Sequence, residues 1–280
     1  MFFRQNILQN ILKTALLIEY DGTAFAGWQI QENARTVQSE MQKAFRQLYG
    51  AEIAVHGAGR TDTGVHARGM VAHVELPDES TMTLFKLMVA INSTTPHDIV
   101  IRDLRPVADD FHARHSALAR QYRYSITRER TAIDRNYIWA IWRDVDESSL
   151  VRVTSLLVGE HDFTSFSKRS NDVEHYRCIV EDASWDFRGT NLAMTIRANR
   201  FVRGMVRALV GAIVQVGQGI LSEEQFELLL LRPEDVARAK YIAPAHGLVL
   251  EGVEYPERFG LWHINEPLLS PSNKTYLKYD

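Results

Sequence analysis

The sequence contains a single cysteine, Cys178, among its 280 residues. One cysteine cannot form an internal disulfide, and it cannot supply a metal site built from several thiolates. The longest uncharged apolar run, 208–214, has about seven residues, far fewer than the roughly 18 that cross a bilayer. No basic segment followed by an apolar stretch and a small-residue cleavage site opens the chain. We therefore expect a soluble, cytoplasmic protein with no membrane anchor.

The chain also lacks a large excess of charge of either sign. Its 32 basic and 35 acidic residues leave a net charge of −3. Apolar residues make up 45% and charged residues 24%, which are ordinary values for globular proteins and argue against disorder. At about 150 residues per domain, the length predicts two domains or one large domain.

Arginine is nevertheless unevenly distributed along the chain. Segment 111–130 holds five arginines against one acid, and 197–207 holds four arginines and no acid. Segment 221–280 carries ten acids against six bases. The arginine-rich segments can hold a phosphate-rich ligand through bidentate contacts. From composition alone, the alternative that these charges lie on solvated faces of helices and strands is equally well supported.

Hydrophobic periodicity and turn residues predict two successive α+β units. In the first, the predicted elements are a strand at 15–20, a helix capped by Thr36 with Gly50 past its end, strands at 52–57 and 69–76, a helix at 83–91 and a strand at 98–105. In the second, they are a strand at 120–127, a helix at 146–158, strands at 176–187 and 190–198, a helix at 200–216, a helix after the capping box Ser222–Gln225 and a strand at 247–254. The first order is the split βαβ pattern of a ferredoxin-like domain.

This pattern predicts the α+β class, with two ferredoxin-like or RRM-like lobes whose mainly antiparallel sheets meet at a central active-site cleft. The expected boundaries are an N-terminal extension at 1–13, a first lobe at 14–110, a second lobe at 111–255 and a C-terminal extension at 256–280.

The loop at 57–67 is the strongest candidate for chemistry. It is long for a connection between two strands and rich in glycine and polar groups, as functional loops on rigid scaffolds tend to be. Its only carboxylate is Asp62, two residues after Arg60. From spacing alone, a catalytic Asp62 and an Asp62 that shapes the loop through an Asx-turn are equally supported.

Segment 59–67 (GRTDTGVHA) resembles the catalytic motif of the tRNA pseudouridine synthase A family. Further segments resemble that family in the same order: 20–29 (YDGTAFAGWQ), 36–38 (TVQ), Asn92, 96–99 (PHDI), 111–114 (FHAR), 120–124 (RQYRY), 159–163 (GEHDF), 201–207 (FVRGMVR) and 243–248 (APAHGL). The resemblance covers 14–255. It departs at Thr63, where the family often has alanine, and near Gln121, where it often has a basic residue.

The resemblance implies an isomerase that converts uridine to pseudouridine in the anticodon stem-loop of tRNA, at positions 38, 39 and 40, without a cofactor. It implies that Asp62 is the catalytic carboxylate, acting as a nucleophile at C1′ or as a base at C2′. Arg207 would be its cationic partner, and Tyr122 would pack on the uracil. Arg60 would occupy the space that the flipped base leaves. The alternatives are an ordinary strand residue for Tyr122 and a structural pair with Asp62 for Arg60.

The expected partners are tRNA and a second copy of the chain in a homodimer. The candidates for RNA contacts are Arg68, Arg114, Arg120, Arg123 and Arg203. One alternative function is a catalytically silent RNA-binding module with two RRM-like lobes, although no RNP-type aromatic motif is present. Another is a metal-dependent hydrolase that uses histidines, but the spacing of His56, His66, His73, His112 and His115 forms no recognised ligand set, so no metal is expected.

Overall fold

The computed structural model describes residues 11–77, 82–168, 174–233 and 239–264. Its strands are β1 (Ile11–Tyr20), β2 (His56–Gly57), β3 (His66–Pro77), β4 (Ile99–Pro106), β5 (Ala119–Thr127), β6 (Trp139–Ala140), β7 (Gly159–Asp162), β8 (Arg177–Arg188), β9 (Asn191–Ala198) and β10 (Leu248–Glu254). Its α-helices are α1 (Val37–Tyr49), α2 (Leu84–Thr94), α3 (Glu147–Ser155), α4 (Met205–Gly217) and α5 (Glu223–Leu231). The 3₁₀ helices are η1 (Gly22–Ala24), η2 (Thr164–Phe166), η3 (Ala245–Gly247) and η4 (Glu257–Phe259).

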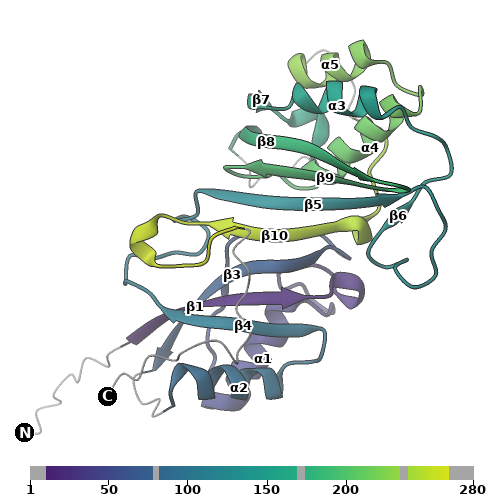
Figure 1. Cartoon of the computed structure of the whole chain (residues 1–280). Helices are drawn as coiled ribbons and strands as arrows, with labels where there is room; N and C mark the ends of the chain where they lie inside the picture. Colours follow the sequence, from purple (N-terminus) through teal and green to yellow (C-terminus); the bar gives the residue numbers. More distant parts are fainter. Residues whose placement is uncertain (1–10, 78–81, 169–173, 234–238, 265–280) are drawn as a thin grey trace, which may run out of the picture.

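One sheet runs through the whole molecule, in the order β4-β1-β3-β10-β5-β9-β8-β7 (Figure 1). β2 pairs with β3, and β6 pairs with β5. Most neighbours are antiparallel, which agrees with the predicted α+β class. Helix α2 packs against β4, whereas α3 packs against β8 and α4 at the other end of the sheet.

Strand β10, which follows every other strand in the sequence, lies in the middle of this sheet. It pairs in parallel with β3 and antiparallel with β5. Ala67 of β3, Leu250 of β10 and Tyr122 of β5 therefore lie side by side across three strands. This register brings the start of β3, and the loop that precedes it, next to the second half of the chain.

Local capping signals explain where two of the predicted helices begin. The Thr36 side chain accepts a hydrogen bond from the Ser39 amide at the start of α1, and Gly50 ends that helix with a positive φ of 67°. Ser222 and Gln225 form the predicted capping box at the start of α5.

Other elements are shorter than predicted. The strand expected at 52–57 is reduced to His56–Gly57. The helix expected from residue 200 begins only at Met205, because Gly204 has a φ of 77° and this left-handed conformation cannot continue a right-handed helix. Among the described residues, no helix has the length and apolar character needed to cross a membrane.

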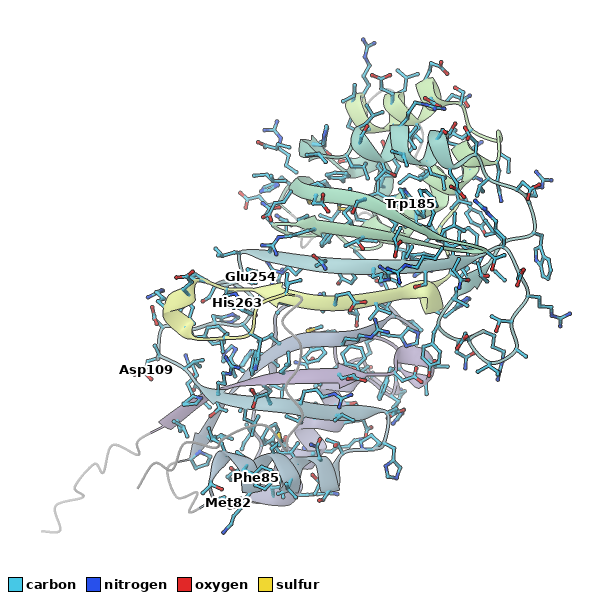
Figure 2. All side chains as sticks on the ribbon, in the orientation of Figure 1. Met82, Phe85, Asp109, Trp185, Glu254 and His263 are labelled. Carbon is cyan, nitrogen blue, oxygen red and sulfur yellow. The ribbon has the colours of Figure 1, made fainter. Side chains whose placement is uncertain are left out.

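Two hydrophobic cores lie in the two halves of the sheet, and Tyr122 packs against both of them. Residues 256–264, expected to belong to a C-terminal extension, contribute Phe259, Leu261 and Trp262 to the first core. Figure 2 shows His263 beside Glu254 at the end of β10, with 2.7 Å between His263 Nδ1 and Glu254 Oε1. The remaining extension residues, 1–10 and 265–280, lie outside the described part of the chain.

Candidate active site

Asp62 lies in the loop between β2 and β3, on a tight turn. The Val65 amide donates a hydrogen bond of 3.1 Å to the Asp62 carbonyl, and the Gly64 amide donates one of 3.2 Å to the Phe25 carbonyl. Gly64 has a φ of 78°, which side chains other than glycine rarely adopt. The turn therefore depends on glycine at this position.

Thr61 and Val65, on either side of the turn, are buried against the end of β1 and the segment that follows it. The hydroxyls of Thr61 and Tyr20 lie 2.8 Å apart in the interior. Gly22 lies so close to the loop that an added Cβ would be 2.1 Å from the Val65 carbonyl oxygen. Between these two buried residues, the Asp62 side chain is 28% exposed at the surface of the loop.

The cationic partner of Asp62 is Arg207, in the first turn of α4. Arg207 Nη1 lies 3.4 Å from Asp62 Oδ2, and the Arg207 side chain is 22% exposed. Its Nε donates to the Ala243 carbonyl at 2.8 Å, while the Ala243 amide donates to the Arg207 carbonyl at 3.0 Å. This pair of bonds fixes the guanidinium in front of the carboxylate.

Tyr122 completes the arrangement from β5. Its ring contacts Phe201 edge-on, with 5.1 Å between centroids. Burial raises the pKa of the Tyr122 hydroxyl, and the nearby negative charge of Asp62 raises it further. Tyr122 is therefore neutral at physiological pH and lies within electrostatic reach of the carboxylate. A carboxylate, a guanidinium and an aromatic ring from three distant segments thus meet at one place.

Arg60 is exposed, and neither an ion pair nor a hydrogen bond joins its side chain to Asp62. Among the described residues, the ion pair of Asp62 is made with Arg207, and no ion pair is made by Arg60. The structural pairing of Arg60 with Asp62, the alternative left open by the sequence, is therefore not what the structure shows.

A family model described as tRNA pseudouridine synthase matches residues 16–116 and 153–256. The chain is 39% identical to the tRNA pseudouridine synthase A of Porphyromonas gingivalis, over 86% of this chain and 96% of that protein. It is 40% identical to the protein of the same name from a Picosynechococcus species, over 88% and 89% of the two chains. For the Enterobacter protein of that name the identity is 38%, over 91% and 94%.

The chain belongs to the tRNA pseudouridine synthase family. It is accordingly an enzyme, an isomerase, and the resemblance of its motifs to this family is confirmed.

The five arginines expected to contact RNA lie in different environments in this pseudouridine synthase. The Arg120 guanidinium donates to four backbone carbonyls, at 2.8 to 3.2 Å, including that of Ala58 in the loop that carries Asp62. Burial lowers the pKa of Arg120. Arg114 and Arg203 are exposed and make no ion pair with any residue that the structure describes.

Arg68 and Arg123 lie together on the face of the sheet opposite to the Tyr122 side chain. Both line a polar hollow of about 450 Å³, where Arg68 Nη1 is 2.8 Å from Glu251 Oε1 and Arg123 Nη2 is 3.5 Å from Asp186 Oδ2. Successive side chains of a strand point to opposite faces of the sheet, so Arg123 and Tyr122 face opposite ways. These two arginines are therefore not part of the Asp62 site.

The histidines gather in a cluster that does not resemble a metal centre. The rings of His56, His73, His112 and His115 follow one another at centroid distances of 4.4 to 4.9 Å, with His56 and His112 5.9 Å apart. The Nδ1 atoms of His73 and His112 accept backbone N–H groups instead of pointing into a common space. Within the described ranges, no group of three or more His, Cys, Asp or Glu side chains can hold a metal ion.

This cluster predicts a loss of stability at mildly acidic pH. Burial, together with the positive charges of His112, His56 and Lys13, lowers the pKa of His73 to about 3. In the unfolded chain a histidine has a pKa of about 6.5, so below this pH the unfolded state binds a proton that the folded state rejects. We expect the wild-type free energy of unfolding to fall by about 2 kcal/mol more than that of His73→Asn between pH 7 and pH 5.

Urea unfolding of both proteins at a series of pH values measures this difference. Asparagine keeps an acceptor for the Ala113 amide, which donates to His73 Nδ1 at 3.2 Å. The exposed His97 provides a matched control, because His97→Asn should follow the wild-type curve. Parallel curves for wild type and His73→Asn would contradict the expectation.

Sequence reasoning missed several residues that build the site. Ala243 lies in a segment that resembles the family, but no pattern indicated that it orients Arg207. Nothing in the sequence indicated that Asn136 and Tyr137, in the loop between β5 and β6, contact His66 and Asp21 next to the loop that carries Asp62.

Proposed function

We propose that this enzyme converts uridine to pseudouridine in the anticodon arm of tRNA, at positions 38, 39 and 40, with Asp62 as the catalytic carboxylate. The observation that carries this proposal is the meeting of Asp62, Arg207 and Tyr122 at one partly exposed place. The match to relatives named tRNA pseudouridine synthase A supports it. The three positions follow from the resemblance to that family.

The reaction is a rearrangement within one nucleotide. The bond between C1′ and N1 breaks, the uracil turns, and a bond forms between C1′ and C5. N1 gains a proton and C5 loses one, so no electrons are exchanged and no cofactor is required. Asp62 acts either as a nucleophile at C1′ or as a base that removes a proton from C2′, and in both cases it must be ionised.

Arg207 supports the ionised form of Asp62. A guanidinium cannot be deprotonated near neutral pH, so it offers a permanent positive charge beside the carboxylate. Bound RNA would exclude water from this site, and the charge pair would then interact more strongly. The Tyr122 ring offers a face for the extruded uracil, and its neutral hydroxyl lies near the base that must exchange a proton.

The exposed arginines are the residues that we propose to contact the RNA. Arg60 is free to enter the space that the flipped uridine leaves, and Arg114 and Arg203 are free to contact phosphates. Arg68, Arg120 and Arg123 remain candidates with less support, because each already has partners in the protein. The homodimer and the cytoplasmic location also belong to this proposal and rest on the resemblance to the family.

Mapping of pseudouridine in anticodon-arm transcripts tests the proposed function. Each transcript carries uridine at only one of the positions 38, 39 or 40, and a fourth carries uridine only in the loop, outside these positions. We expect pseudouridine in the first three transcripts and none in the fourth. Conversion of the fourth transcript alone, or of none, would contradict the proposal.

A further inference from the structure

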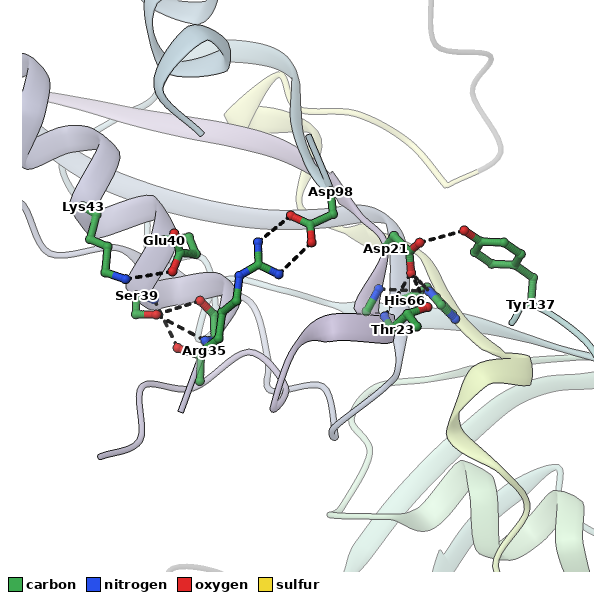
Figure 3. A network of polar contacts seen from close by, with 11 residues as sticks. Asp21, Thr23, Arg35, Ser39, Glu40, Lys43, His66, Asp98 and Tyr137 are labelled. Carbon is green, nitrogen blue, oxygen red and sulfur yellow. Dashed lines mark hydrogen bonds and ion pairs between the residues drawn. The ribbon is translucent and has the colours of Figure 1, made fainter. Parts of the chain in front are cut away.

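A polar network lies next to the loop that carries Asp62. Figure 3 shows Asp21 between the Tyr137 hydroxyl and the His66 ring, with Thr23 beside it. We call Asp21, Gly22, His66, Asn136 and Tyr137 the His66 network. Its members come from three segments that are far apart in the sequence: the end of β1, the start of β3 and the loop before β6.

His66 is the centre of this network and is only 4% exposed. Its Nδ1 accepts the Gly22 amide at 2.9 Å, and its Nε2 lies 3.0 Å from the Asn136 carbonyl oxygen. Nδ1 also lies 3.1 Å from Asp21 Oδ1, so both ring nitrogens have polar partners. Each ring nitrogen thus joins the start of β3 to a different segment.

Tyr137 and Asp21 are joined to each other by a hydrogen bond, and both lie beside His66. The Tyr137 hydroxyl donates to Asp21 Oδ2 at 2.7 Å, and the Tyr137 ring lies 5.1 Å from that of His66. Burial raises the pKa of Asp21, but hydrogen bonds from Thr23 and Tyr137 outweigh this effect and lower it below the usual range. An ionised Asp21 therefore holds Tyr137 in place from the opposite end of the network.

The network acts on the turn that carries Asp62. His66 directly follows Val65, whose amide donates to the Asp62 carbonyl. Ala245 also packs against the turn, 3.2 Å from the point where a Cβ of Gly64 would lie. The turn therefore adjoins both the 243–247 segment, which also orients Arg207, and the His66 network.

The segment bearing Asn136 continues into β6, which pairs with β5, the strand of Tyr122. His66 thus ties the Asp62 turn to the half of the molecule that supplies Tyr122. It does not line the site itself, because its ring is enclosed and both nitrogens are engaged.

We propose that His66 is a positioning residue for the isomerisation: its two hydrogen bonds set the direction in which the Asp62 carboxylate faces Arg207 and Tyr122. This inference rests on the proposed role of Asp62, because His66 acts through it. A small shift of a reacting group costs on the order of 100-fold in rate without weakening substrate binding.

The test uses three substitutions that separate the two hydrogen bonds. His66→Ala removes both, His66→Asn keeps an acceptor where Nδ1 lies, and His66→Gln keeps a donor where Nε2 lies. The measurements are the single-turnover rate constant on an anticodon-arm transcript with saturating enzyme, the Kd for that RNA, and the fraction of enzyme that binds it.

We expect the rate constant of His66→Ala to fall by about 30- to 100-fold with a Kd within about twofold of the wild type. His66→Gln should recover more of the rate than His66→Asn, since it keeps the bond to Asn136. A structural role alone would lower the binding-competent fraction and the melting temperature but leave the rate constant per competent enzyme unchanged. That result, or a full rate in His66→Ala, would overturn the proposal.

Tyr137→Phe keeps the inference testable if the His66 variants do not fold. Tyr137 is 45% exposed, and this change removes only the hydroxyl that donates to Asp21. We expect a smaller fall in rate constant, about 3- to 10-fold, again at unchanged Kd. Tyr49→Phe is the matched control, because the buried Tyr49 hydroxyl has no hydrogen-bond partner in the described part of the chain. A Tyr137→Phe rate equal to that of Tyr49→Phe would contradict the inference.

Failure of this inference is distinguishable from failure of the proposed function. If the wild type forms no pseudouridine, the proposed function is wrong. If the wild type is active and the rate constants of the His66 and Tyr137 variants match it, only the positioning role is wrong.

Discussion

Asp62→Asn is expected to lower the rate of pseudouridine formation by about 10⁴-fold or more while leaving RNA binding nearly unchanged. The amide has the size of the carboxylate and keeps an oxygen that accepts from Arg207. It has no ionised oxygen to attack C1′ or to take a proton from C2′. Single-turnover assays with an anticodon-arm transcript, combined with a binding measurement on the same RNA, check both parts.

Asp144→Asn is a matched control for this substitution, because Asp144 is exposed and lies in the segment between β6 and α3. It should keep the wild-type rate. A rate for Asp62→Asn within tenfold of the wild type would show that the carboxylate does not react. If neither the wild type nor Asp62→Asn formed pseudouridine but both bound the RNA, the protein would instead be a catalytically silent RNA-binding module.

Arg207→Gln is expected to lower the rate by about 10³-fold, because it removes the cation that faces Asp62. Glutamine also lacks the fork with which Arg207 holds Ala243 and Asp62 together. Arg207→Lys keeps the charge and loses the fork, so we expect a smaller loss, about 10- to 100-fold. The decisive measurement is the ranking of the three rate constants, which should fall from the wild type to Arg207→Lys to Arg207→Gln.

Arg188→Gln controls for the loss of an arginine elsewhere. Arg188 is exposed at the end of β8, where its Nε lies 2.9 Å from Asp186 Oδ2. Exposed pairs of this kind contribute little to stability, and we expect no change in rate. Equal rates for Arg207→Gln and Arg207→Lys would mean that the fork matters and the charge does not.

Local signals in the sequence predicted much of the fold. The caps at Thr36 and Ser222 marked two helix starts correctly, because a cap depends only on residues three positions apart. The start of α4 was placed too early, since the apolar pattern continues upstream of Gly204 while the backbone does not. The central position of β10 could not be predicted, because it depends on pairing with strands that are remote in the sequence.

The site was harder to predict than the fold, because most of its contacts join residues that are remote in the sequence. Asp62 stands out as the only carboxylate of its loop, but Arg207 is 145 residues away and entered only through the resemblance to the family. Counting charges assigned Arg120 to RNA, whereas backbone carbonyls, which carry no sequence signal, surround its guanidinium. His66 was weighed as a metal ligand, and its partner at Asn136 lies 70 residues further on.

A crystal structure of the enzyme with an anticodon-arm RNA, trapped by Asp62→Asn, tests the central claim most directly. We predict that the target uridine is turned out of the RNA, with its C1′ and C2′ atoms beside the side chain of residue 62. The uracil should lie against the Tyr122 ring, and Arg207 should still face residue 62. A ribose bound far from residue 62, with the Tyr122 ring uncovered, would contradict the account.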